Sequence, residues 1–130
     1  MKLIKEIITP LPEVIDRYTI ALLKLERLDK SEIDIDEMQE QVDYYKSGID
    51  FSNERIVNLT DELYKVNGNI WDIEGSIRKG LDDDLGYEEI GKRAVMVRDL
   101  NRNRMKIKND IIELTGDGFK DCKMNCIAEG

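Results

Sequence analysis

The chain contains no histidine, so the commonest general base and a common zinc ligand are missing from its candidates for catalysis. It has only two cysteines, Cys122 and Cys126, which lie four positions apart. Two thiols alone do not complete a tetrahedral zinc site. We expect two free thiols, and the alternatives are a redox pair or a half-site completed by a second subunit. No serine or cysteine lies in a recognisable nucleophile motif, so carboxylates are the remaining catalytic candidates.

The sequence also lacks a long apolar run. Lys5 and Glu6 interrupt the N-terminal stretch before it can resemble a signal peptide, and no segment approaches the length of a membrane span. The net charge is −8, and a negative protein repels both phosphate backbones and anionic membrane surfaces. We therefore expect a cytoplasmic protein that binds neither membranes nor, in general, nucleic acids, and that carries no cofactor or metal.

What the chain does have is charge and helical periodicity. Charged residues make up 37% of its 130 residues and hydrophobic residues 41%, a balance typical of long, partly solvated helices. A chain of this length suits one domain with a core of its own. We expect a single helical domain over residues 1–118 and a tail over residues 119–130.

An apolar seam is the strongest pattern in the sequence. Its residues recur every four and then three positions, and only Ser52 is polar among the twelve: Met38, Val42, Tyr45, Ile49, Ser52, Ile56, Leu59, Leu63, Val66, Ile70, Ile73 and Ile77. The spacing predicts one amphipathic helix over about residues 36–79. Such a rod would be roughly 60 Å long at 1.5 Å per residue, too long for one small domain to cover.

Two consequences of this seam are open. If the helix is unbroken, we expect a homodimer that covers its apolar face along residues 38–77. If it breaks near Ser47–Gly48 or Ser52–Asn53, the rod becomes two ordinary helices.

Two further helices flank the seam. Prolines at 10 and 12 followed by Glu13 are typical of a helix start, and the first helix continues with apolar residues at helical spacing. Asp34 or Asp36 is a suitable cap for the second helix. The third helix runs through Ile90 to Leu114 and ends at Gly116–Gly118. The sequence thus predicts an all-α bundle of three main helices with a long central one.

An acidic pattern on the predicted second helix can be interpreted as a catalytic metal site or as a solvated acidic face. Glu37, Glu40 and Asp43 share about one face, a spacing that can hold Mg²⁺ if other carboxylates oppose it. The pattern resembles half of the paired acidic motif of all-α nucleoside-triphosphate pyrophosphatases. The second half is missing downstream, so a solvated acidic face is the better interpretation.

The predicted third helix is basic in an otherwise acidic protein. Asp99 is the one acidic residue among seven basic ones: Lys92, Arg93, Arg98, Arg102, Arg104, Lys106 and Lys108. These residues fit an anionic ligand such as a nucleotide or sugar phosphate. The plain alternative is pairing with the acidic residues 29–54, in the same molecule or in a partner.

Three blocks of the sequence carry a resemblance to a known family. They are Asp16-Arg17-x-Thr19-Ile20-x-x-x-Lys24-x-Glu26-Arg27, Asn67-x-x-Ile70-Trp71-x-Ile73-Glu74-x-x-Ile77-Arg78, and Asn101-x-x-Arg104-x-x-x-Lys108. In this order the blocks resemble a family of small helical bacterial and phage proteins of unknown function. The resemblance covers about half of the chain and implies no established activity. The chain departs from the family in a longer second helix and in its cysteine-bearing tail.

The polar residues of these blocks form three rows at the edge of one predicted core. We predict that the rows meet as a small ligand-binding site or as a structural network that fixes the helix register. The candidate residues are Asp16, Thr19, Lys24, Asn67, Trp71, Glu74, Arg78, Asn101, Arg104 and Lys108.

Two functions follow from these patterns. The favoured one is a non-catalytic helical assembly or accessory protein. The alternative is a binding protein or enzyme for a phosphorylated small molecule, with Arg78, Arg104 and Lys108 as anion ligands in a pocket walled by Trp71. In that case Glu74 or Asp16 serves as the acid or base.

Overall fold

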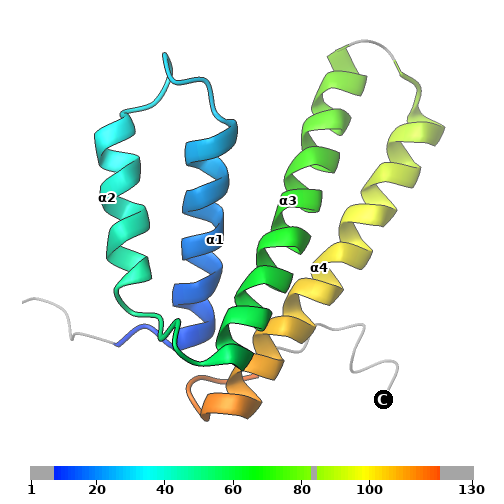
Figure 1. Ribbon diagram of the computed structural model, residues 1–130. Coiled ribbons are helices and arrows are strands. Elements are labelled where there is room, and N and C mark those ends of the chain that lie inside the picture. The colour runs from blue at the N-terminus through cyan, green and yellow to red at the C-terminus, as the bar shows by residue number, and fades with distance from the viewer. Residues whose placement is uncertain (1–7, 83–84, 121–130) are drawn as a thin grey trace, which may run out of the picture.

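The computed structural model describes residues 8–82 and 85–120 and places four helices in them. They are α1 (Leu11–Arg27), α2 (Ile35–Lys46), α3 (Glu54–Asp82) and α4 (Tyr87–Thr115). The described residues contain no strand, which confirms the all-α prediction. The helices form two antiparallel hairpins, α1–α2 and α3–α4, which diverge towards their tips (Figure 1). Cys122 and Cys126 lie outside the described residues, as does the predicted tail beyond residue 120.

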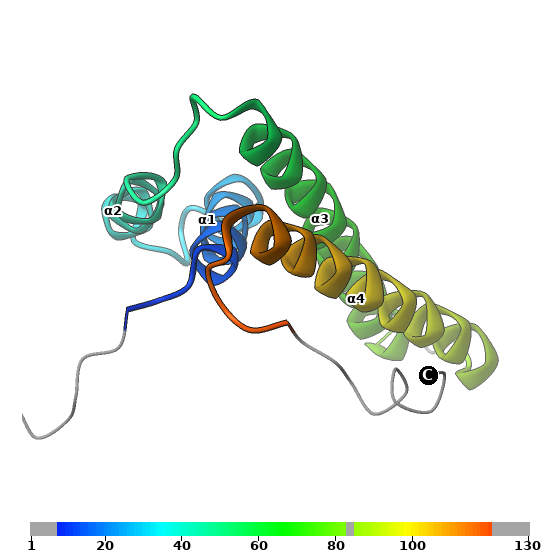
Figure 2. The same cartoon turned by 90° about the horizontal axis from the view of Figure 1, so that it is seen from below.

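Helix α1 lies in the middle of the molecule. It packs against α2 on one side and against both α3 and α4 on the other (Figure 2). Within the described ranges, α2 contacts no helix other than α1. The outer surface of α2 is therefore not covered by the α3–α4 hairpin.

The core lies where the two hairpins meet. Its buried side chains are all aliphatic and come from α1, α3, α4 and the α2–α3 loop: Ile15, Ile49, Ile56, Leu63, Ile107 and Ile111. Burying each such side chain contributes on the order of 2 kcal/mol relative to its exposure. This cluster fixes the shared base of the two hairpins.

The prediction of one unbroken helix over residues 36–79 is wrong. Helix α2 ends at Lys46 and α3 begins at Glu54, so the break falls at the alternative positions near Ser47–Gly48 and Ser52–Asn53. The Asn53 side chain accepts hydrogen bonds from two backbone amides of the first turn of α3, at 3.0 and 3.2 Å. Side-chain caps of this kind favour a helix start.

The loop between α2 and α3 keeps the apolar spacing of the seam, which is why the sequence predicted a single long helix. Ile49 lies between the helices, yet it is buried in the core. The Asp50 carboxylate accepts hydrogen bonds from the amide and hydroxyl of Ser52, which closes a tight turn. Apolar periodicity therefore continued across a segment whose backbone is not helical.

The fold also covers much of the seam within one chain. Val42, Ile49, Ile56 and Leu63 are all buried. The structure therefore leaves no continuous free seam along residues 38–77 for a partner to cover. Dimerisation along residues 38–77 stays a prediction.

The helix ends agree with their sequence signals. Helix α1 begins after Pro10, and Asp34 caps α2 by accepting a hydrogen bond from the amide of Glu37 at 3.1 Å. Helix α4 ends at Thr115 and is capped by Gly116, which has a φ of 70° that favours glycine. The next residue, Asp117, accepts a 2.8 Å hydrogen bond from the amide of Leu11. The end of α4 thus satisfies a free donor at the start of α1.

Candidate functional site

An ion pair between α1 and α4 forms the centre of the polar residues that the sequence singled out. The Asp16 carboxylate accepts two hydrogen bonds from the Arg104 guanidinium, from Nε at 3.0 Å and from Nη2 at 2.5 Å. Asp16 is 3% exposed, whereas the Arg104 side chain is 32% exposed. A two-point contact of this kind fixes the relative orientation of the two helices.

Helix α3 joins the same cluster through Asn67. The Asn67 amide donates to Asp16 Oδ1 and to Thr19 Oγ1, both at 2.9 Å. The Thr19 hydroxyl in turn donates to the carbonyl oxygen of Asp16 at 2.8 Å. Asp16, Thr19 and Asn67 are all buried, so the cluster links three helices through hydrogen bonds that solvent barely reaches.

The electrostatics of the cluster keep Asp16 ionised. Burial raises the pKa of Asp16, but the hydrogen bonds from Arg104 and Asn67 and the charges of Arg104 and Lys108 outweigh it, so the pKa lies below its usual value. The hydrogen bond to Asp16 raises the pKa of Arg104, against the opposing effect of burial. A carboxylate held ionised in this way is poorly suited to act as a general acid or base near neutral pH.

A second ion pair lies beside the first. Lys108 Nζ contacts Glu13 Oε1 at 2.6 Å, and the Lys108 side chain is only 13% exposed. Glu13 precedes Asp16 by three positions and therefore shares its face of α1. Sequence reasoning did not assign Glu13 to the site, although this spacing was the available signal.

The far end of α1 is tied to α3 by a further contact that sequence reasoning missed. The Arg27 guanidinium forms an ion pair with Asp72 and donates to the carbonyl oxygen of Gly68 at 3.1 Å. A Cβ at position 68 would lie 3.2 Å from Arg27 Nη2, so glycine permits this close approach. Tyr64 donates a hydrogen bond to Glu26 one turn earlier on α3.

The remaining candidates do not join the cluster. Lys24, Trp71 and Asn101 are half-buried, and Glu74 and Arg78 are exposed. Over residues 8–82 and 85–120, no hydrogen bond or ion pair links these five side chains to Asp16 or Arg104. The charge of Glu74 helps to raise the pKa of Arg104, but through hydrogen bonds the three predicted rows meet only at Asp16, Thr19, Asn67 and Arg104.

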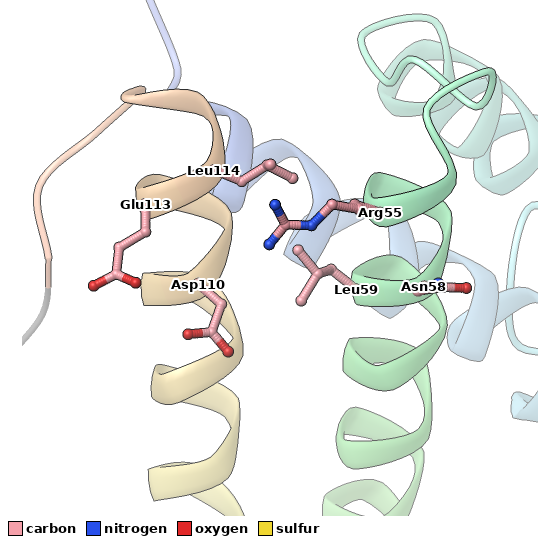
Figure 3. Close-up of a pocket in the computed structure, with 6 residues that line it drawn as sticks. All are labelled: Arg55, Asn58, Leu59, Asp110, Glu113 and Leu114. Carbon is pink, nitrogen blue, oxygen red and sulfur yellow. The ribbon is translucent and has the colours of Figure 1, made fainter.

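One cleft lies elsewhere, between the start of α3 and the end of α4. It has a volume of about 580 Å³ and is lined by Arg55, Asn58, Leu59, Asp110, Glu113 and Leu114. Figure 3 shows Leu59 and the Arg55 guanidinium pointing towards α4, and Leu114 pointing back towards α3. A neighbouring cleft of about 480 Å³ shares Asp110 and includes Lys65 and Lys106. Neither cleft contains any of the ten candidate site residues, although Lys106 of the second cleft belongs to the basic set of α4.

The acidic face of α2 is exposed. Glu37, Glu40 and Asp43 all face solvent, and α2 contacts only α1. In the part of the chain that the structure describes, no three Asp, Glu or Cys side chains lie close enough together to hold a metal ion. None of the described helices combines the length and the apolar character needed to cross a bilayer.

No protein-family model matches the chain, and neither a curated protein nor a solved structure matches it significantly. The resemblance inferred from the three sequence blocks therefore stays a prediction.

Proposed function

We propose that this chain is a non-catalytic helical assembly protein that acts as a homodimer. The observation that supports it most is the number of large apolar and aromatic side chains left on the surface of the described helices and loops. Tyr44 is 72% exposed and Met96 52% exposed, and the others are Ile8, Ile35, Phe51, Leu85, Tyr87, Val95 and Phe119. Four of them lie within residues 85–96, in the α3–α4 connection and the first half of α4, and exposed apolar side chains that gather in one part of the surface are typical of an interaction surface.

The polar cluster supports the non-catalytic part of the proposal. Across the described residues, every buried side-chain nitrogen or oxygen has a hydrogen-bond partner within the protein. Asp16 is engaged by Arg104 and Asn67, so its hydrogen bonds serve the helix packing. Such a satisfied network specifies one register of the three helices.

The phosphorylated-ligand alternative has less support. Two of its three proposed anion ligands, Arg104 and Lys108, already pair with the carboxylates of Asp16 and Glu13. A phosphate would have to displace both carboxylates and leave the buried Asp16 without its cation, which is costly. The third ligand, Arg78, is exposed on α3.

Two measurements test the proposal together. Light scattering after size-exclusion chromatography should give a mass near twice the 15.1 kDa of one chain at high concentration. A thermal-shift screen with inorganic phosphate, nucleotides and sugar phosphates, with and without Mg²⁺, should leave the melting temperature unchanged. A monomer that is stabilised by a phosphorylated compound would support the alternative instead.

A further inference from the structure

The two clefts between α3 and α4 form one groove. They share Asp110, and the second continues from the first towards the tip of the hairpin. We call this surface the α3–α4 groove; its walls are residues 55–66 of α3 and 103–114 of α4. Neither cleft includes Asn67 or Arg104, through which α3 and α4 bind α1. In the view into the first cleft, α1 lies behind the two helices (Figure 3). The groove therefore opens on the side of the hairpin that faces away from α1.

Two lines of apolar side chains run along α3, and they are covered to different extents. Ile56 and Leu63 of the predicted seam are buried in the core. Leu59 and Val66, which alternate with them along the seam, are half-buried and line the groove. Because seven residues make about two helical turns, Ile73 continues this second line, and it is half-buried as well. Helix α3 thus presents every second residue of the seam to the groove.

Helix α4 adds apolar side chains to the opposite wall. Ile107 and Leu114 are seven residues apart and line the groove from α4. Met96 lies seven residues before Asn103, which also lines the groove, so Met96 falls on the same side of the helix. Its side chain is 52% exposed. An apolar strip therefore runs from the base of the hairpin to the exposed apolar residues of the first half of α4.

The rim of the groove carries opposite charges at matched heights. The first cleft has Arg55 on α3 and Glu113 on α4, and the second has Glu62 on α3 and Lys106 on α4. All four side chains are exposed. In the part of the chain that the structure describes, no ion pair joins Arg55 to Glu113 or Glu62 to Lys106, and Glu113 pairs instead with Lys120. These charges are therefore placed to pair across an interface.

The groove as a whole has no net charge, although the chain carries −8. Lys65 and Asp110 add one charge of each sign to the four at the rim, which makes three cations and three carboxylates. A partner drawn by net charge, such as a nucleic acid or a strongly basic peptide, gains nothing from such a surface. A partner with the same set of charges, arranged in the opposite order, fits it.

We infer that the α3–α4 groove packs on the same groove of a second copy of this chain, about a two-fold axis parallel to the helices. The inference rests on the proposed assembly function and names the surface that carries it. This axis places α3 of one copy opposite α4 of the other at the same height, so the four helices form an antiparallel bundle. Helices α1 and α2 lie on the far side of each hairpin and leave the contact open (Figure 2). One patch meets its own copy, so the dimer closes.

The symmetry brings the opposite charges of the rim together. Arg55 faces the partner's Glu113, and Glu62 faces the partner's Lys106. Each contact forms twice, because the axis exchanges the two copies. Between these pairs the two apolar strips face each other, which supplies the hydrophobic part of the contact, while the charges fix its register.

Charge-reversal variants of the full chain test this packing. Glu62→Lys and Lys106→Glu each reverse one charge at the rim of the groove. Glu40→Lys on α2 and Lys30→Glu in the α1–α2 loop make the same changes at exposed positions on the other hairpin and serve as matched controls. Circular dichroism melts establish that each variant folds, and sedimentation equilibrium gives the dimer Kd.

We expect each groove variant to raise the dimer Kd at least about tenfold, since each places like charges together at two contacts. The controls should stay within about threefold of the unaltered chain. An equimolar mixture of the two groove variants should dimerise again, because one copy then carries lysine and the other glutamate at both positions 62 and 106. Within each chain of that mixture the two charges are still alike, so recovery must come from contacts between copies.

Three results would overturn the inference, and they separate it from the proposed function. If the chain dimerises but the groove variants behave like the controls, the surface is wrong and the assembly function stands. If both variants weaken the dimer but their mixture does not restore it, the direct pairing of residues 62 and 106 between copies is wrong. If the unaltered chain stays monomeric at every concentration, both proposals fail.

Discussion

Asp16 and Arg104 lie 88 positions apart in the chain, yet they form the two-point ion pair that joins the first helix to the last. The carboxylate is almost fully buried, and the guanidinium lies at the edge of the core. A buried charge is stable only when its partner is in place. This pair therefore ties correct packing of the α3–α4 hairpin on α1 to one specific contact.

Arg104→Met should destabilise the fold by about 2 to 4 kcal/mol, because it leaves the Asp16 carboxylate buried without its cation. The estimate lies towards the lower end of the range for buried pairs because Arg104 is partly exposed. Urea unfolding followed by circular dichroism measures the change.

Arg98→Met is the matched control, since Arg98 is exposed and its partner Asp99 is the adjacent residue on the same helix. It should change the unfolding free energy by less than about 0.5 kcal/mol. Equal losses for the two variants would mean that the Asp16 contact adds nothing to stability.

The ion pair should also make stability depend on pH. The pKa of Asp16 is lowered in the folded state, so its contribution is present above the unfolded pKa of about 3.8 and is lost as the pH falls through the folded value. The unfolding free-energy gap between the unaltered chain and Asp16→Asn should therefore be constant above about pH 5 and shrink below about pH 4.

This gap is measured by urea titrations at a series of pH values, because titrations common to both proteins cancel in the difference. A gap that does not change, or that widens as the pH falls, would contradict the account of Asp16.

Asn53→Ala should destabilise the protein by about 1 kcal/mol, since it removes the side chain that caps α3. Asn58→Ala is its control, because Asn58 is exposed within the same helix and alanine has the higher helix propensity. The control should be neutral or slightly stabilising. Thermal unfolding measures the stability of both variants. An equal loss of stability in the two would show that the Asn53 side chain does not stabilise the start of α3.

The sequence predicted the helical class and the helix ends at Pro10, Asp34 and Gly116 because these depend on local signals. Pro10, Asp34 and Gly116 each mark a boundary by chemistry that acts within one turn. The break between α2 and α3 was harder to predict, because Ile49 keeps the apolar spacing while it lies in a loop. Periodicity alone does not separate a core residue in a loop from one in a helix.

The polar cluster was predictable only in part. Asp16, Asn67 and Arg104 lie at core-facing positions, and a polar residue there requires a partner. Which partner it takes depends on how the hairpins pack, and that is a long-range property. Glu74 and Arg78 continue the same row of α3, but it diverges from α1 and they remain exposed (Figure 1).

The central claim is that the chain assembles with a second copy of itself. The most direct test is sedimentation equilibrium of the full chain over a dilution series. The account predicts a mass that rises from 15.1 kDa to twice that value with concentration. A mass of 15.1 kDa at every concentration would contradict it.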